Sequence, residues 1–348
     1  MKILAIETSC DETAVAILEC NGSLPLPTFK VLGNSLMSQI QIHEKYGGVY
    51  PMLAKREHIK NLPILLEKTL VESGIKNHES NEIDYIAVTA GPGLEPALWT
   101  GITFAEELGR KFSKPVLPIN HMEGHLMSFL FNATKSLMLP AIALLVSGGH
   151  TELVLMESFD NYKIIGKTRD DAVGEAFDKT ARLLGFPYPG GPKISGLAAR
   201  DRSKNQESRF KFPRPMLKTD DFDFSYSGLK TAVLYAMRKL EKVDEEIKEN
   251  LARAFEDAAI EPLIEKTRKA TEKYSARSII IGGGVSANTY LRSELKKLCE
   301  ENGLEFQMPE RAITTDNAIM IGIVAYVRSL TNRLPEKTTI AAKGNLSL

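Results

Sequence analysis

The sequence of 348 residues contains few cysteines and no long apolar run. Its three cysteines, Cys10, Cys20 and Cys299, form no CxxC pair, which argues against a disulfide framework and against a thiolate zinc site. No apolar run approaches the roughly 20 residues that span a bilayer. The first residues contain neither a cleavable signal nor an Arg-rich presequence. We therefore expect a cytoplasmic protein with reduced cysteines and no membrane segment.

The sequence also lacks net charge, because 44 basic residues face 44 acidic ones. Nucleic-acid-binding proteins are usually basic overall. The stretch from Lys193 to Lys218 is locally different, with eight basic residues against two acidic ones, and it includes Phe210 and Phe212. Such a stretch can hold a phosphate backbone and stack a base. It is also typical of a solvated surface loop, and composition alone favours this second interpretation.

The order of expected secondary structure repeats once along the chain. β-Branched runs and helical periodicity in the first part predict strands at 2–8, 13–18, 31–39 and 85–89 and helices at 51–72 and 97–112. The second part predicts strands at 141–146, 152–156, 163–166 and 278–281 and helices from about 288 and at 319–327. Two α/β domains with a central cleft account for this repetition. We expect domains at 1–134 and 135–348, the second with a mostly helical insertion at about 192–276.

The two common glycine-rich nucleotide-binding patterns, GxGxxG and GxxxxGK[ST], are both absent, which disfavours dinucleotide and Walker-type binding. Three other turns follow expected strands, at residues 7–9, 146–150 and 282–288. Backbone N–H groups in such turns can point at an anion, and a following helix N-terminus adds positive dipole. One such turn is weak evidence, but three at equivalent places in two halves would converge on one cleft.

The segment HMEGH at residues 121–125 is the most specific local motif. Its spacing places His121 and His125 on one face of a helix, one turn apart, which suits two ligands of a transition metal. Two histidines that line a helix without metal would have the same spacing. The HExxH motif of metalloproteases has Glu directly after the first His, whereas Met122 stands there and the glutamate is Glu123.

Carboxylates elsewhere in the chain could complete such a site. Asp316 precedes an apolar helix, where it could be an N-cap or the third ligand of a two-His, one-carboxylate centre. Asp178 is expected on a helix that ends before the turn YPGGP, and in a nucleotide cleft it would hold ribose hydroxyls. Asp11 and Glu12 occupy the polar tip of the first hairpin, where most such residues are only solvated.

Nine segments of the chain together resemble one known family. They are ILAIETSCDETAVAI, GGVYPMLAKREH, VTAGPGL, NHMEGH, LVSGGHTEL, GEAFDKTARLLGFPYPGGP, FSYSGLKT, GGGVSAN and TTDNAIM, and they run from residue 3 to about 320. In this order they resemble the TsaD family, the catalytic subunits of tRNA threonylcarbamoyladenosine synthesis, within the actin-like ATPase superfamily. The form VSGGHT is similar to bacterial members.

The resemblance implies a fold and a reaction. The fold would be two actin-like α/β domains. The activity would be acyl transfer from threonylcarbamoyl-AMP to N6 of adenosine 37 in tRNA, just 3′ of the anticodon, with release of AMP. One Fe²⁺ per subunit would be bound by His121, His125 and Asp316, although zinc would suit the same ligands.

The resemblance also implies residue roles and partners. The donor would bind Leu145, Val146, Ser147, Gly148, Gly149, Asp178, Gly191 and Asn288. Asp11 and Glu12 would orient the reacting groups. A TsaB-like paralogue and a TsaE-like ATPase would be partners, and the helix at 51–72 would meet the paralogue, although its apolar stripe is equally compatible with a core position.

Three other functions agree less well with the sequence. The glycine turns alone would allow an actin-like ATPase or a small-molecule kinase, but the paired histidines and the turn Glu7-Thr8-Ser9, in place of Asp-x-Gly, argue against it. A non-catalytic scaffold similar to TsaB would be shorter and would lack both histidines. A metalloprotease would need Glu in place of Met122.

Overall fold

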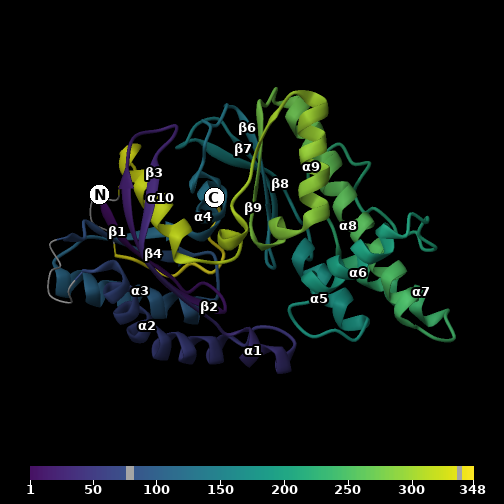
Figure 1. Cartoon of the computed structure of the whole chain (residues 1–348), viewed down its shortest axis with the longest axis horizontal. Helices are drawn as coiled ribbons and strands as arrows, with labels where there is room; N and C mark the ends of the chain where they lie inside the picture. The colour runs from purple at the N-terminus through teal and green to yellow at the C-terminus, as the bar shows by residue number, and fades with distance from the viewer. Residues whose placement is uncertain (76–81, 335–338) are drawn as a thin grey trace. The chain divides into compact units, whose positions relative to one another are not determined.

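The computed structural model describes residues 1–75, 82–334 and 339–348, which form two compact units (Figure 1). The first unit comprises residues 1–137 and 309–348, and the second comprises residues 138–308. The sequence placed everything after residue 135 in the second domain. The chain instead rejoins the first unit, because the apolar helix α10 (Ala318–Leu330) packs on strands β1 (Lys2–Glu7) and β2 (Glu12–Asn21).

The first unit is built on a five-stranded sheet with the order β3-β2-β1-β4-β5. β1, β2 and β3 are antiparallel neighbours, whereas β4 and β5 run parallel to β1. The remaining strands are β3 (Thr28–Ser38), β4 (Tyr85–Gly91) and β5 (Val116–Asn120). The helices are α1 (Ile40–His43), η1 (Glu44–Tyr46), α2 (Pro51–Ser73), α3 (Glu95–Phe112), α4 (His121–Met127), η3 (Ser128–Leu130), η5 (Arg311–Ile313) and α10.

The second unit repeats this arrangement in the order β10-β9-β6-β7-β8. β6, β7 and β8 are antiparallel, and β9 and β10 continue the sheet in parallel from β6. The strands are β6 (Ala141–Val146), β7 (Thr151–Met156), β8 (Tyr162–Lys167), β9 (Ser278–Gly282) and β10 (Glu305–Gln307). The helices are α5 (Val173–Leu183), α6 (Gly191–Ser203), α7 (Ser227–Arg238), α8 (Glu245–Lys273), η4 (Gly284–Ala287) and α9 (Thr289–Asn302). The predicted fold class, two actin-like α/β domains, is thereby confirmed.

Most of the expected elements occur, but two strands were not predicted and one side chain of α2 is more exposed than expected. The sequence did not predict β5 or β10, because β5 includes a proline and lies at the sheet edge, where proline is tolerated, and β10 is only three residues long. In α2 the expected apolar stripe is only partly buried. Leu62 and Leu65 face the core, but Ile59 is 55% exposed. Among the described helices, none is both long and apolar enough to cross a membrane.

The two faces of the first sheet are covered by different helices. Leu4 and Ile6 belong to the apolar cluster with α2 and α3. Ala5 lies on the opposite face, under α10. Gly322 permits this contact, because a Cβ at that position would lie 2.2 Å from Cδ1 of Leu18. The helix begins at Ala318 after its N-cap Asn317, which places Asp316 directly before the cap.

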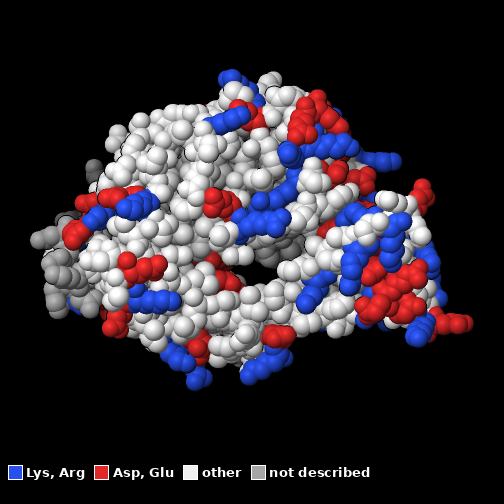
Figure 2. Space-filling view, viewed as in Figure 1, with Lys and Arg blue, Asp and Glu red and all other residues white. Residues whose placement is uncertain are grey.

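The basic stretch from Lys193 to Lys218 is largely neutralised within the second unit. Acidic residues of α8 form ion pairs with five of its basic residues, namely Arg200, Arg202, Lys204, Arg209 and Arg214. Phe212 is buried and Phe210 packs against the same core. Figure 2 shows blue and red side chains interspersed over these helices. The contacts therefore favour a structural role for this stretch over a phosphate-binding patch.

A buried histidine gives the first unit a pH-dependent stability. His58 on α2 is fully buried, and burial lowers the pKa of its imidazole below the usual 6.5. The unfolded chain therefore takes up a proton near pH 6.5 that the folded chain binds only at lower pH, so stability falls as the pH falls. The contribution of neutral His58 is complete above about pH 6.5 and is lost below it, at no more than about 1.4 kcal/mol per pH unit.

We predict that wild type loses more thermal stability than His58→Gln between about pH 7.5 and about pH 5.5. Glutamine cannot take up this proton, so the variant lacks the His58 contribution to the pH slope. The difference should reach a few degrees in Tm, since 1 kcal/mol corresponds to about 2–4 °C in domains of this size. Melting curves at the two pH values measure it. Equal slopes in both proteins would contradict the assignment.

Candidate functional site

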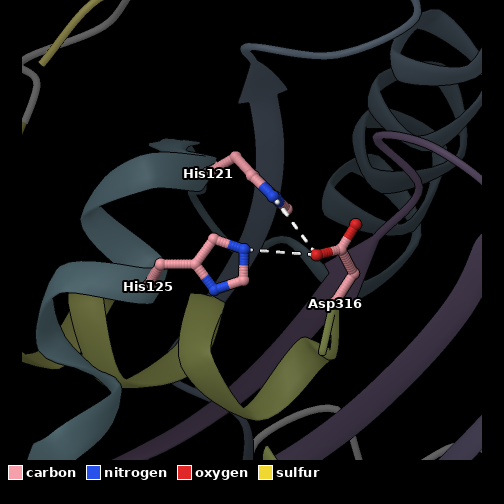
Figure 3. A group of neighbouring side chains, drawn as sticks. All are labelled: His121, His125 and Asp316. Carbon is pink, nitrogen blue, oxygen red and sulfur yellow. Dashed lines mark ion pairs between the residues drawn. The ribbon is translucent and has the colours of Figure 1, made fainter. Parts of the chain in front are cut away.

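The two histidines and Asp316 meet in the first unit (Figure 3). β5 leads directly into α4, whose N-cap residue Asn120 accepts hydrogen bonds from the backbone N–H groups of Met122 and Glu123. The helix therefore starts at His121 and presents His125 one turn later on the same face. Asp316 comes from the other side, just before Asn317, the N-cap of α10.

Two features hold α4 against α10. Gly124 permits the close approach, because a Cβ there would lie 2.9 Å from Cγ of Met320. Glu123 points away from the histidines and accepts hydrogen bonds from Arg328 at 2.9 Å and 2.6 Å. Glu123 is thus a structural anchor, and it is not placed to act as the base of a metalloprotease.

The donor atoms have the spacing of ligands that share one cation. Oδ1 of Asp316 lies 3.4 Å from Nε2 of His121 and 3.2 Å from Nε2 of His125. One ligand atom from each residue lies within 4.8 Å of the others. Ligands about 2.1 Å from a tetrahedral ion lie about 3.4 Å apart. The chemistry of the set, two imidazoles and a carboxylate, suits a divalent transition metal.

The polar atoms of His125 also fit a metal centre. Its side chain is buried, and neither ring nitrogen makes a hydrogen bond within the described residues. Burial lowers the pKa of this imidazole, which keeps it in the neutral form that binds metals. A buried ring nitrogen that makes no hydrogen bond is costly, and a cation at Nε2 would remove that cost at this nitrogen.

Glu7 is a part of the site that the sequence did not predict as such. It lies at the end of β1, fully buried, and its Oε2 is 3.1 Å from Nδ1 of His121 and accepts a 2.7 Å hydrogen bond from Thr89. Burial would raise the pKa of Glu7, but the adjacent His121 holds it below its ordinary value. An ionised carboxylate only accepts, so Nδ1 carries the proton and Nε2 is left for a metal. The sequence signal for this role was a glutamate directly after four apolar residues of the strand.

Asp11, the last residue of the turn between β1 and β2, and Glu12, the first residue of β2, lie close to the same cluster. Oδ2 of Asp11 is buried and has no hydrogen-bond partner among the described residues. Glu12 accepts a hydrogen bond from Ser38 at 3.2 Å. Burial and the neighbouring carboxylates of Asp316 and Asp11 raise the pKa of Glu12 to about 10. This environment favours the protonated form of Glu12, whereas Asp11 offers an unused acceptor oxygen.

In the second unit, the turn after β6 contains part of the predicted donor-binding stretch. Leu145 and Val146 end the strand and are fully buried, so their side chains serve the core. The hydroxyl of Ser147 closes the turn by accepting hydrogen bonds from the backbone N–H groups of Gly149 and His150. Gly148 and Gly149 are exposed, and a Cβ at either position would meet no atom within 4 Å. The turn therefore presents open backbone.

Asp178 on α5 holds the start of α6, which includes the predicted donor-binding residue Gly191. Its Oδ1 accepts hydrogen bonds from the N–H groups of Gly190 at 2.7 Å and Gly191 at 3.3 Å. These are the first amides of α6, so Asp178 acts as a cap from a neighbouring helix. A Cβ at Gly190 would lie 2.2 Å from Cβ of Ala181. The requirement for glycine here thus comes from packing against α5.

Asn288 connects α9 to the same helix. Its side-chain oxygen caps α9 by accepting from the Leu291 amide, and its Nδ2 donates to Ser195 on α6 and to Glu256 on α8 at 2.8 Å and 2.7 Å. Asp178, Gly191 and Asn288 are therefore gathered around the first turns of α6. β6 and β9 are parallel neighbours, so the turns that follow them lie at the same sheet edge.

The duplicated mixed sheet and the two-His, one-Asp cluster define an actin-like α/β protein with a candidate divalent-metal centre. The chain belongs to the family described as "TsaD: tRNA N6-adenosine threonylcarbamoyltransferase", whose profile matches residues 30–323. It is therefore a transferase of tRNA threonylcarbamoyladenosine modification, as the sequence predicted.

Proteins with that name are similar along nearly the whole chain. The one from Thermosipho africanus is 44% identical over 100% of both chains. Those from Aromatoleum aromaticum and Staphylococcus saprophyticus are 45% and 43% identical, over 94% and 93% of this chain and 92% and 90% of theirs. Among solved structures, HypF of T. kodakarensis has a TM-score of 0.63 over 95% of this chain and 48% of its own, at 13% identity. That likeness shows the fold alone.

We predict that the chain binds one divalent cation and that Glu7→Gln weakens this binding by about ten- to hundredfold. The variant keeps the volume of the side chain but removes the charge that holds Nδ1 protonated. Competition between the protein and a chromophoric chelator for Co²⁺ measures the affinity. Glu152→Gln, which changes a buried strand glutamate of the second unit, is the matched control and should bind as wild type does. Wild-type affinity in Glu7→Gln would contradict the role of Glu7.

Proposed function

We propose that this protein transfers the threonylcarbamoyl group from threonylcarbamoyl-AMP to N6 of adenosine 37 in tRNA and that it acts in the cytoplasm. The observation that supports this best is the convergence of His121, His125 and Asp316 in a chain of this family. Those residues would hold one divalent metal ion, Fe²⁺ by resemblance to the family, and zinc would suit the same donors. When bound, the ion would polarise an acyl or phosphate oxygen of the donor.

The transfer needs no covalent enzyme intermediate. The N6 amine attacks the carbamoyl carbon, a C–N bond forms, and the bond from that carbon to the phosphate oxygen breaks. AMP leaves with the electron pair, and N6 gives up one proton. Oδ2 of Asp11, buried and without a hydrogen-bond partner among the described residues, is our candidate to accept it. Protonated Glu12 would donate a hydrogen bond to an oxygen of the reacting groups.

The residues of the second unit would bind the nucleotide part of the donor. The open space beside Gly148 and Gly149 would admit a phosphate of the donor, because a Cβ at either position would meet no atom within 4 Å. Gly191 stands in the first turn of α6, where the helix dipole also favours negative charge. Asp178 and Asn288 would hold this region in shape and contact the nucleoside from either side of the helix.

We predict that the protein, with its partner proteins, forms threonylcarbamoyladenosine from threonylcarbamoyl-AMP and unmodified tRNA. Asp316→Asn should lower the rate by about a hundredfold or more, because the cation loses its charged ligand. Asp84→Asn, the same substitution at an exposed aspartate of the first unit, should leave the rate within about twofold of wild type. Nucleoside analysis of digested tRNA measures the product.

Two outcomes would contradict the proposal. One is the lack of product in wild type with donor, tRNA and partners all present. The other is ATP-dependent phosphorylation of a small-molecule acceptor at a higher rate, which would favour an actin-like kinase. Metal-free protein that still modifies tRNA would remove the metal role and leave the transferase.

We also propose that the exposed face of α2 binds a TsaB-like paralogue, with a TsaE-like ATPase joining the pair. Met52, Ile59, Ile64 and Val71 are each more than half exposed on this helix, and Tyr46 and Tyr50 extend the surface at its start. Exposed apolar side chains in such number are typical of a protein-binding surface. The same helix buries Leu62 and Leu65, so it serves both core and interface.

We predict that Ile59→Glu weakens the complex with the paralogue by about tenfold or more. The side chain is exposed, so the change should leave folding and metal content intact. Leu26→Glu, an exposed apolar position in the loop between β2 and β3, controls for a general loss of apolar surface. Titration calorimetry with the purified paralogue measures the affinity. Equal affinity in Ile59→Glu and wild type would exclude this face.

A further inference from the structure

A buried polar network connects helix α2 with the segment Cys10–Thr13, which includes the end of the turn after β1 and carries Asp11 and Glu12. His58 on α2 is fully buried, and its two ring nitrogens contact the residues on either side of these carboxylates. Nδ1 lies 2.8 Å from the hydroxyl oxygen of Thr13, and Nε2 lies 3.0 Å from the carbonyl oxygen of Cys10. One side chain therefore holds both ends of this segment.

The partners of His58 determine its tautomer. The Cys10 carbonyl can only accept a hydrogen bond, so Nε2 carries the proton and donates it. Nδ1 then accepts from the Thr13 hydroxyl. A neutral imidazole has one donor and one acceptor, and both are used. His58 thus has no nitrogen left to bind a metal or to exchange protons with a substrate.

Gln39, which follows β3, makes further contacts with the same network. Its backbone N–H donates to the carbonyl oxygen of Asp11 at 2.9 Å. Its side-chain Nε2 lies 3.3 Å from Nδ1 of His58, and its Oε1 lies 3.1 Å from Nε2 of His43. Both Gln39 and His43 are buried. The segment is therefore held at the backbone carbonyls of Cys10 and Asp11 and at the side chain of Thr13, by groups that make no other evident contribution to the site.

We propose that His58 is a positioning residue that holds Asp11 and Glu12 beside the cluster of His121, His125 and Asp316. The inference rests on the role proposed above for the two carboxylates. Loss of His58 would free the turn without removing either carboxylate or any metal ligand. Because a misplacement of about 1 Å can cost about a hundredfold in rate, the effect should fall on kcat, and the binding of tRNA and donor should remain.

Four variants distinguish a positioning role of His58 from a general effect on stability. His58→Ala removes both contacts, and Thr13→Val removes one hydroxyl with little change of shape. His58→Gln keeps an N–H donor that can reach the Cys10 carbonyl. Thr69→Val is the matched control, because Thr69 is also buried on α2 and donates to a β2 carbonyl, that of Val15, at 3.2 Å. It removes the same kind of contact between α2 and β2, away from the turn.

We expect His58→Ala to lower kcat by about ten- to hundredfold, with KM for tRNA and for threonylcarbamoyl-AMP within about twofold of wild type and with metal content unchanged. Thr13→Val should show a smaller loss, and His58→Gln should recover part of the rate. Thr69→Val should keep kcat within about twofold of wild type. An equal loss of kcat in Thr69→Val and His58→Ala would overturn the proposal, because it would indicate only a general loss of stability.

Hydrogen exchange of the full-length protein gives a readout that does not depend on activity. Amides of residues 8–14 should exchange faster in His58→Ala and Thr13→Val than in wild type and Thr69→Val. Unchanged exchange in this segment together with wild-type kcat in His58→Ala would contradict the positioning role. If wild type itself makes no modified nucleoside, the proposed function fails, whereas the exchange data still decide whether His58 holds the turn.

Discussion

The candidate metal centre depends on the close packing of one apolar helix. Asp316 reaches the two histidines only because α10 lies tightly against β1, β2 and α4. Two glycines make this possible, since a side chain at Gly322 would collide with Leu18 and a side chain at Gly124 would collide with Met320. The ion pair between Glu123 and Arg328 then holds α4 in place. Packing between helices, by residues that are not themselves donors, thus sets the spacing of three donor atoms.

The same region shows what the sequence could predict about the site. The spacing of His121 and His125 was visible because a helix brings residues four apart to one face. Asp316 could be named as the third ligand because a carboxylate before an apolar helix is a recognisable pattern. The role of Glu7 could not be read, because nothing in a sequence reports that the end of β1 lies against a particular imidazole. His58 was hidden for the same reason, since it acts on a turn 45 residues away.

The fold was predicted well where the periodicity was strong and less well where tertiary packing decides. The strands of both sheets were evident from apolar and β-branched runs, and only the short edge strands were missed. Residues 309–348 were assigned to the wrong half, because the helix at 318–330 is apolar on all sides and its sequence does not say which sheet it covers. For the basic stretch, composition favoured a surface loop and left a phosphate-binding patch open. The ion pairs that favour a structural role come from acidic residues of α8, which are far along the chain but adjacent in space.

The central claim is that tRNA modification by this chain depends on a cation held by His121, His125 and Asp316. The most direct measurement uses protein loaded with graded amounts of metal under anaerobic conditions, each supplied with threonylcarbamoyl-AMP, unmodified tRNA and partner proteins for a single turnover. The account predicts that modified adenosine formed per chain rises in proportion to metal occupancy and vanishes with it. Product formation that is independent of occupancy would contradict the account.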